Sequence, residues 1–182
     1  MAPLGRAGHQ YGQIMAQNPQ NQKIFPKCSI LFVCTANQCR SPMAEVLFKN
    51  YLEESGEIPE NWLVASAGLY AYPNYPATDN AQSVMANRGL DLSNHRSQAV
   101  TESLLEKFNL ILCMELNHKR TIKRNFPSAA DKVFLLYELV NENKEIWDPV
   151  GSSFSAYEST AGEILSIIMM GFEKIKKLAR AD

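Results

Sequence analysis

The strongest structural signals of the chain lie in one segment, Ser29-Ile30-Leu31-Phe32-Val33-Cys34-Thr35-Ala36-Asn37-Gln38-Cys39-Arg40-Ser41-Pro42. Its first five residues are mostly apolar or β-branched, which predicts a buried strand. Ser41 and Pro42 suit the N-cap and the first position of a helix, and apolar residues recur at helical spacing from Pro42 to Tyr51. The stretch therefore predicts a strand, a short loop and a helix in direct succession.

The loop between this strand and this helix is suited to binding an anion. It contains small or polar residues from Thr35 to Cys39, and such a loop can turn successive backbone N–H groups inward. The positive end of the helix dipole lies behind these amides. Ligands of an open parallel sheet bind at this same edge, where strands end and loops lead into helices.

A cysteine and an arginine, Cys34 and Arg40, stand at the two ends of the loop. The amides, the dipole and the guanidinium all favour negative charge, so we expect Cys34 to react as a thiolate. Arg40 can hold two oxygens of a phosphate with its planar fork. The spacing alone is weak evidence, because a buried cysteine and a solvated arginine would also produce it. The strand, the small residues and the helix start together favour a nucleophilic site.

Strand and helix patterns alternate along the rest of the chain. The sequence predicts further strands at 62–65, 110–113 and 132–136 and further helices at 78–87 and 155–179. The last helix is expected to open with a capping box, Ser155-Ala156-Tyr157-Glu158. This alternation predicts an α/β fold, a three-layer sandwich with a four-stranded, mainly parallel sheet flanked by helices.

The chain divides into a short N-terminal segment and one domain. Residues 1–27 contain no acidic residue, several glutamines and prolines and no periodic apolar face, a composition typical of a mobile tail. Residues 28–182 hold all the strong secondary-structure signals and are expected to form a single domain. A chain of 182 residues buries roughly 70% of its extended surface on folding, so no disulfide or structural metal is needed.

Composition and charge argue against several kinds of partner. The chain has 18 Lys and Arg against 19 Asp and Glu, and no basic cluster points to nucleic acid. No run of 18 apolar residues or apolar signal segment is present, so we expect a cytoplasmic protein with no membrane partner. The four cysteines lack the pairing and the histidine spacing of zinc sites, so no metal is expected.

The loop closely resembles the phosphate-binding loop of the low-molecular-weight protein tyrosine phosphatases. The resemblance begins with the segment from Ile30 to Glu45. Three more motifs follow in the order of that family, and they are Ser66-Ala67-Gly68, Arg88-Gly89-Leu90-Asp91-Leu92-Ser93-Asn94-His95-Arg96 and Trp147-Asp148-Pro149. The resemblance covers residues 28–182, the whole predicted domain.

The resemblance implies three catalytic residues, with Cys34 as nucleophile, Arg40 as clamp of the transition state and Asp148 as general acid and base. A phosphatase needs a proton donor for its leaving group, and an Asp in a loop that leads into a helix suits this role, although a lone Asp-Pro is more often a surface turn. The implied substrate-binding residues are Thr35, Ala36, Asn37, Gln38, Cys39, Ser41 and Tyr72.

Other residues of these motifs are expected to support the loop. Ser41 would also donate a hydrogen bond to the thiolate, and Asn37, Ser66 and His95 would form a polar network. For His95 a purely structural role stays open. Animal members of the family have two tyrosines after the general acid, where this chain has Val150-Gly151. Tyr70 or Tyr72 would then wall the pocket, unless they have ordinary surface roles.

The family's reaction has two steps and uses no cofactor. The thiolate attacks phosphorus while Asp148 protonates the departing oxygen, and the resulting cysteinyl-phosphate is hydrolysed by a water that the same carboxylate activates. The expected function is thus hydrolysis of phosphotyrosine in phosphorylated protein substrates, by a monomer or weak dimer.

Two departures from the family's pattern leave the substrate open. Ala36 stands where the family usually has Gly, and Gln38 stands where tyrosine phosphatases commonly have Ile or Leu and protein-arginine phosphatases have Thr. A protein-arginine phosphatase is therefore an alternative. An arsenate reductase of the same fold is another, but it needs further redox cysteines, and we expect Cys113 to be a buried core thiol. A phosphate-binding module without turnover is opposed by the retained Cys, Arg and Asp.

Cys39 has two interpretations that the sequence does not separate. A thiol five residues after the nucleophile could condense with an oxidised Cys34 and so protect it by a reversible disulfide. It could equally pack under the start of the helix.

Overall fold

The computed structural model describes residues 27–180, so the predicted N-terminal tail, apart from Lys27, lies outside the described residues. The elements, in chain order, are β1 (Cys28–Cys34), α1 (Arg40–Glu54), η2 (Pro59–Asn61), β2 (Trp62–Gly68), α2 (Asp79–Asn87), α3 (Glu102–Leu105), β3 (Leu110–Cys113), α4 (Leu116–Asn125), η3 (Pro127–Lys132), β4 (Val133–Leu135), η4 (Leu136–Val140), α5 (Phe154–Met170) and α6 (Phe172–Ala179), where η marks a 3-10 helix.

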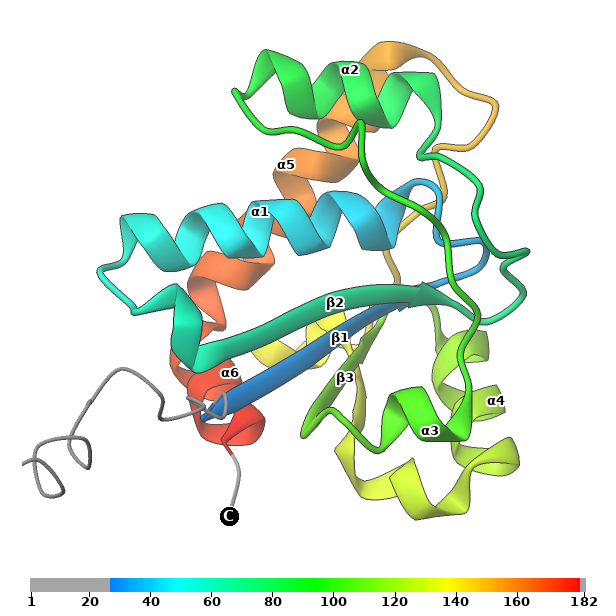
Figure 1. Cartoon of the computed structure of the whole chain (residues 1–182), viewed down its shortest axis with the longest axis vertical. Coiled ribbons are helices and arrows are strands. Elements are labelled where there is room, and N and C mark those ends of the chain that lie inside the picture. The colour runs from blue at the N-terminus through cyan, green and yellow to red at the C-terminus, as the bar shows by residue number, and fades with distance from the viewer. Residues whose placement is uncertain (1–26, 181–182) are drawn as a thin grey trace, which may run out of the picture.

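The four strands form one parallel sheet in the order β2-β1-β3-β4. β1 is central and pairs along its whole length with β2, from Cys28 opposite Trp62 to Cys34 opposite Gly68. All carboxyl ends therefore meet at one edge of the sheet, which Figure 1 shows at the arrowheads. Cys34 ends the central strand at this edge. The predicted four-stranded α/β architecture is confirmed.

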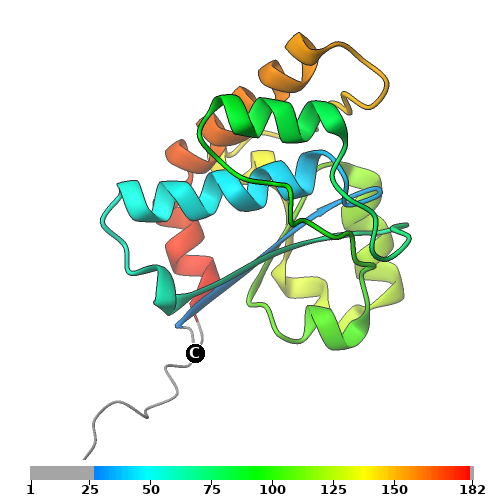
Figure 2. The ribbon, with the colours of Figure 1, turned by 45° about the horizontal axis from the view of Figure 1, so that its top comes forward.

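Helices cover both faces of the sheet and complete three layers. Figures 1 and 2 show α1, α2, α5 and α6 on one face and α3 and α4 on the other. β1 is buried throughout, and its side chains alternate between two apolar clusters, with Ile30 and Phe32 in the first and Leu31 and Val33 in the second. Burial on both faces explains why the strand appears in the sequence as a continuous apolar run.

The first helix starts earlier than the sequence predicts. α1 begins at Arg40 with Cys39 at the N-cap, so the prediction of Ser41 as N-cap and Pro42 as first helical residue is wrong. The Ser41 hydroxyl is not available for capping because the loop uses it. It accepts a hydrogen bond from Asn37 Nδ2 at 2.9 Å and lies within donating distance, 3.2 Å, of the Ala67 carbonyl.

The C-terminal segment also differs from its prediction. Ser153 is the N-cap of α5 and its hydroxyl accepts from the Ala156 amide, so the capping box at Ser155 is wrong. The segment is two helices and not one, with Gly171 between them. A Cβ at Gly171 would stand only 2.6 Å from Leu139 Cβ. The glycine therefore lets the junction between the helices pass close to η4.

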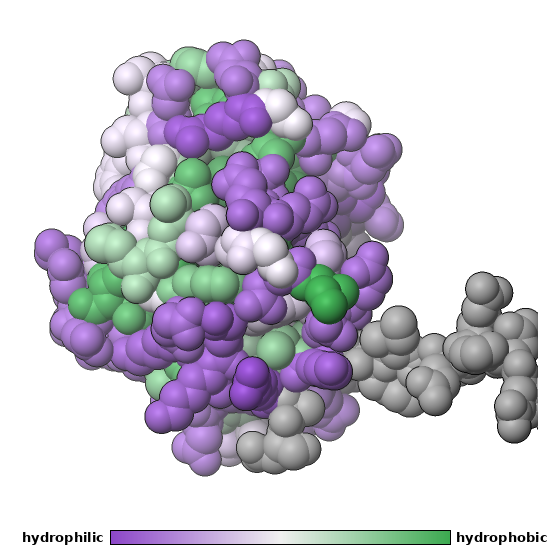
Figure 3. Space-filling view, turned by 90° about the vertical axis from the view of Figure 1, so that its left-hand side faces the viewer, coloured by the Kyte–Doolittle hydropathy of each residue, from purple (hydrophilic) through white to green (hydrophobic). Residues whose placement is uncertain are grey.

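The outer surface shows no large apolar face in the view of Figure 3. This side lies on the left in Figure 1, away from the carboxyl ends of the strands, and hydrophilic side chains cover most of it while hydrophobic ones gather in a limited area. Within residues 27–180 no helix has the length and hydrophobicity that crossing a bilayer requires.

Candidate active site

The loop between β1 and α1 is packed tightly against the end of β2. A Cβ at Gly68 would stand 2.7 Å from the Asn37 amide nitrogen and 2.8 Å from the Ala36 carbonyl carbon, so this position has room only for a glycine. Ala36 is not among the residues with positive φ, whereas Asn37 has a φ of 55°. The left-handed residue of the loop is thus Asn37, and alanine at position 36 is accommodated without backbone strain.

Asn37 is the centre of the hydrogen bonds that hold the loop. Its buried side-chain amide donates to Ser41 Oγ and Ser66 Oγ, each at 2.9 Å, and its Oδ1 accepts from the Gln98 amide at 2.9 Å. Its carbonyl oxygen lies 2.7 Å from His95 Nε2. The structure therefore brings Asn37, Ser66 and His95 together in the polar network that the resemblance implies, and it adds Gln98.

The Cys34 thiol is buried at the start of this loop, beside a hydroxyl. Its Sγ is 3.0 Å from Ser41 Oγ. Because that oxygen already accepts from Asn37, its one proton is free for Cys34 Sγ or for the Ala67 carbonyl, which lies 3.2 Å away. When Cys34 is ionised, a donor is thus in place for the negative sulfur.

Arg40 joins the loop to two distant segments. Its side chain is only 1% exposed, and its Nη1 donates to Glu115 Oε1 at 2.5 Å and to the Ile146 carbonyl at 2.9 Å. Its Nη2 donates to Asp148 Oδ2 at 2.5 Å and to Thr35 Oγ1 at 3.2 Å. Arg40 Nε is buried with no hydrogen-bond partner among residues 27–180. Two carboxylates therefore balance the buried guanidinium charge, and one donor remains unused.

Two residues of this site were missed in the sequence, Glu115 and His118. His118 is buried, its Nδ1 accepts from the Glu115 amide at 3.2 Å and its Nε2 lies 3.0 Å from Thr35 Oγ1. Burial lowers the pKa of His118, with Glu115 opposing and Arg40 reinforcing the shift. The ring is thus neutral near pH 7, with its proton on Nε2 pointing to Thr35. One feature of the sequence could have indicated Glu115. It lies two residues after a predicted strand, at the end of the sheet where ligands bind.

The remaining cysteines are buried thiols. Cys39 and Cys113 are 3% and 0% exposed, and burial raises the pKa of both. The prediction that Cys113 is a core thiol is confirmed. Cys28 is also buried, and all four cysteines are free.

The predicted pocket-wall residues lie around the loop with unequal exposure. Gln38 is half-buried, and its carbonyl oxygen accepts from the Thr78 amide at 2.8 Å. Tyr70 follows β2, and its amide donates to the Thr35 carbonyl at 2.8 Å. The Tyr72 side chain is 78% exposed. Trp147, for which the sequence predicts no role in the pocket wall, is also exposed and precedes Asp148.

No group of three His, Cys, Asp or Glu side chains suited to a metal ion occurs in the part of the chain that the structure describes. The arrangement offers a thiol beside a hydroxyl, a loop of small and polar residues at a helix N-terminus, a buried guanidinium and a nearby carboxylate. These groups together suit attack by sulfur on the central atom of a bound tetrahedral oxyanion.

Comparison with known proteins agrees with this geometry. Residues 29–180 match the family model described as low molecular weight phosphotyrosine protein phosphatase. The chain is 40% identical to a protein-arginine-phosphatase of Bacillus subtilis, over 81% of this chain and 97% of that protein. It is 35% identical to the low molecular weight protein-tyrosine-phosphatase Etp of Escherichia coli K12, over 74% and 85%. Among solved structures, the tyrosine phosphatase Wzb of Escherichia coli K30 in complex with sulphate is 33% identical, with a TM-score of 0.69 over 82% of this chain and 97% of that one.

Proposed function

Because the chain belongs to the low molecular weight phosphotyrosine protein phosphatase family, we propose that it hydrolyses phosphotyrosine in proteins through a cysteinyl-phosphate intermediate. Cys34 is the nucleophile, Arg40 the phosphate clamp and Asp148 the general acid and base. Residues 28–182 form the catalytic domain, which acts in the cytoplasm as a monomer or weak dimer.

In the first step the Cys34 thiolate attacks phosphorus and the bond from phosphorus to the tyrosine oxygen breaks. Asp148 gives its proton to that oxygen, so tyrosine leaves neutral. The loop amides bind the oxygens of the transferred phosphoryl group, and Arg40 stabilises the charge that develops on them. Arg40 Nε, a buried donor without a partner among the described residues, would gain a phosphate oxygen as acceptor.

In the second step water attacks the phosphorus of the cysteinyl-phosphate. The Asp148 carboxylate takes a proton from that water, the sulfur–phosphorus bond breaks, and phosphate leaves with Cys34 again a thiolate. Ser41 Oγ, 3.0 Å from the sulfur, stabilises it as a leaving group. Asp148 is protonated again and ready for the next substrate.

The observation that carries this mechanism is the contact between Arg40 Nη2 and Asp148 Oδ2 at 2.5 Å. These residues are 108 positions apart in the sequence, and the contact brings the candidate acid to the phosphate-binding loop. An Asp that merely formed a surface turn before Pro149 would have no reason to contact the buried arginine of the loop.

A second substrate class has specific support. The relative at 40% identity is named a protein-arginine-phosphatase, and Gln38 gives the rim of the loop a polar amide that could hydrogen-bond a guanidinium. Phosphotyrosine remains the main proposal because the matched family is described by that substrate and because exposed aromatic residues flank the site.

The test compares phosphate release from three peptides that differ only in the phosphorylated residue, which is tyrosine, arginine or serine. We expect the highest kcat/KM for phosphotyrosine. A higher kcat/KM for the phosphoarginine peptide would show that the enzyme is a protein-arginine phosphatase and not a tyrosine phosphatase. Thiol-dependent arsenate reduction without phosphate release would instead favour the reductase, which needs further redox cysteines and is opposed by the burial of Cys28, Cys39 and Cys113.

A further inference from the structure

Trp147 is held rigidly at the surface beside the reacting groups. The residue before it, Ile146, receives a hydrogen bond from Arg40 Nη1 at its carbonyl and donates from its amide to the Met114 carbonyl at 2.8 Å. The residue after it, Asp148, pairs with Arg40. The indole between these anchors is nevertheless 59% exposed. Core packing therefore does not explain a tryptophan at this position, where solvent exposure of so large a ring is unfavourable.

The indole lines a cavity of about 410 Å³ that adjoins the active site. The lining residues are Glu115, Glu145, Ile146, Trp147 and Asp148. Asp148 and Glu115 connect the cavity to Arg40, but no residue of the loop from 34 to 40 lines it. The cavity thus lies beside the place of the phosphate and not within it. A residue next to the phosphorylated one is the part of a protein substrate that would reach it.

Three carboxylates and no basic residue line the cavity, so the lining stays negative even though Arg40 pairs with two of them, Glu115 and Asp148. Glu115 uses Oε1 for Arg40, and Glu145 uses Oε1 to accept from the Leu116 amide at 2.6 Å. The Glu115 side chain also accepts from the backbone amide of His118 in a capping box at the start of α4. The hydrogen bond of the Glu145 side chain falls on Oε1, so its Oε2 can accept from a further donor.

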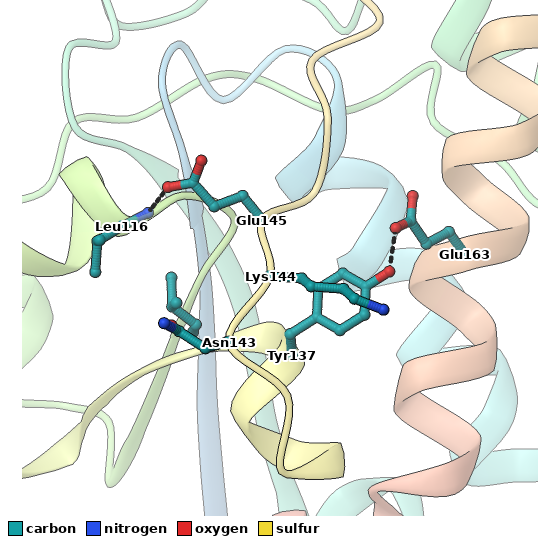
Figure 4. Close-up of a pocket in the computed structure, with 7 residues that line it drawn as sticks. Leu116, Tyr137, Asn143, Lys144, Glu145 and Glu163 are labelled. Atoms are coloured by element: carbon teal, nitrogen blue, oxygen red, sulfur yellow. Dashed lines mark hydrogen bonds between the residues drawn. The ribbon is translucent and has the colours of Figure 1, made fainter.

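The basic residue nearest along the chain does not neutralise this lining. Lys144 pairs with Glu142 at 2.6 Å, and its Nζ lies 5.7 Å from the ring centroid of Tyr137. Figure 4 shows Lys144 beside the Tyr137 ring and directed toward α5, whereas Glu145 points the opposite way, to the start of α4. The charged end of Lys144 therefore pairs with Glu142 on the side of the chain opposite to Glu145, and it does not neutralise the cavity lining.

We propose that this cavity binds a lysine or arginine side chain that flanks the phosphorylated residue of the protein substrate. The face of an exposed indole attracts a cation, and the Oε2 atom of Glu145 accepts its N–H groups. Trp147 and Glu145 are then specificity-determining residues. This subsite presupposes the proposed function, because only a phosphorylated protein has flanking residues.

A basic occupant fits the cavity better than an apolar one. An apolar side chain could cover the indole, but it would remove water from the Glu145 carboxylate without supplying a partner for it. A basic side chain covers the same ring with its methylene groups and pairs with Glu145 through its charged end.

The test uses phosphotyrosine peptides with Lys, Leu or Glu at the position before or after the phosphotyrosine and alanine elsewhere. The measured quantity is the ratio of kcat/KM for the Lys peptide to that for the Glu peptide. In the native enzyme we expect a ratio of at least about fivefold at one of the two positions, the combined size of an exposed cation–π contact and a rim ion pair. The ratio should fall as salt is raised, because these charges are near solvent.

Two variants and two controls assign the effect to the cavity. Trp147→Leu and Glu145→Gln should each lower the ratio about threefold, which corresponds to the loss of one such contact. Trp147→Phe keeps an aromatic face and should lower the ratio less. Glu60→Gln, at the other end of the sheet, should leave the ratio unchanged. Gln at 145 keeps an oxygen for the Leu116 amide. The ratio cancels any change in overall turnover, and the native ratio with its salt dependence is informative even if a variant fails to fold.

A native ratio near one, a preference for the Leu peptide or a ratio that both variants leave unchanged would each overturn the basic subsite. Hydrolysis of all peptides without preference would leave the proposed function standing. Hydrolysis of none of them would contradict the proposed function itself, and the subsite with it.

Discussion

At the scale of single residues, Arg40 determines how the site is assembled. A guanidinium that is 1% exposed needs opposite charge nearby, since an unpaired buried charge is strongly destabilising. Glu115 and Asp148 provide that charge from two segments that follow β3 and η4. The same contacts that make burial of Arg40 tolerable thus also position the carboxylate that we propose as general acid.

Asp148→Ala should lower kcat for phosphotyrosine by about 10²–10³, the usual contribution of a general acid. The loss should be much smaller for an aryl phosphate whose leaving group departs without a proton. Steady-state kinetics with both substrates make the comparison. Asp148→Asn, which can still face Arg40 but cannot donate an acid proton, should resemble the Ala variant. An equal loss on both substrates would deny Asp148 the acid role.

Gln38→Ile should raise kcat/KM for phosphotyrosine peptides by a modest factor. Gln38 is half-buried on the loop, and an apolar side chain there would pack against a phenyl ring, whereas the amide suits a more polar group. One side chain in a pocket is typically worth about 1–3 kcal/mol of discrimination, and the gain should lie at the lower end. If the native enzyme prefers phosphoarginine and Gln38→Ile reverses this order, the substrate is phosphoarginine.

The sequence predicts some site residues and misses others for a physical reason. Cys34 and Arg40 lie on one short loop whose flanking strand and helix have strong local signals. Glu115 and His118 contribute through contacts with residues 75 and 83 positions away. Short-range patterns contain no information about such contacts, and only the parallel pairing of β1 with β3 brings these segments together.

At the scale of elements, strands were predicted more closely than helix ends. β3 has the predicted bounds, because a buried parallel strand appears as a continuous apolar run. Helix starts are harder to predict, because they depend on whether a nearby serine caps the first turn or bonds elsewhere. Ser41 bonds to Asn37 and lies beside Cys34, so α1 starts after Cys39. α5 is capped by Ser153, two residues before the serine of the predicted capping box. α4 was missed because Leu116 and Ile122 are its only apolar residues, so no periodic apolar face marks it in the sequence.

The two serines at the start of α5 provide a matched pair. Ser153→Ala removes the hydroxyl that accepts from the Ala156 amide at 3.4 Å, and it should lower the free energy of unfolding by about 0.5–1 kcal/mol, the lower half of the range for N-caps. Ser155→Ala, in the exposed first turn, should have no such cost, because alanine favours helix. Urea denaturation of both variants measures the difference. A larger loss for Ser155→Ala would contradict the observed helix start.

At the scale of the whole molecule, the parallel sheet determines where chemistry can occur. The order β2-β1-β3-β4 places the ends of β1, β2 and β3 side by side, so the loops that follow them lie together. The loop that we propose to bind phosphate follows β1, Gly68 ends β2 and Glu115 follows β3. Stability of the fold and integrity of the site are therefore linked through the buried groups at this edge.

His118 should make the stability of the molecule depend on pH. Burial lowers its pKa below the ordinary 6.5, so below about pH 6.5 the unfolded chain binds a proton that the native protein does not. The free energy of unfolding should therefore fall as pH drops from 7 to 5, by up to about 1.4 kcal/mol per pH unit. His118→Gln keeps a donor for Thr35 and should flatten this dependence. Urea denaturation at pH 5 and 7 provides the measurement, and equal slopes in both proteins would contradict the assignment.

The proposed reaction depends on a covalent step at Cys34, and phosphate release by Cys34→Ser measures whether that step is required. A serine hydroxyl is far from ionised at pH 7, but the loop amides and Arg40 remain, so this variant should bind phosphate or vanadate yet release no phosphate from a phosphotyrosine peptide. Cys28→Ser, the same change at the remote end of the same strand, should remain active. Turnover by Cys34→Ser comparable to that of Cys28→Ser would contradict the cysteinyl-phosphate mechanism.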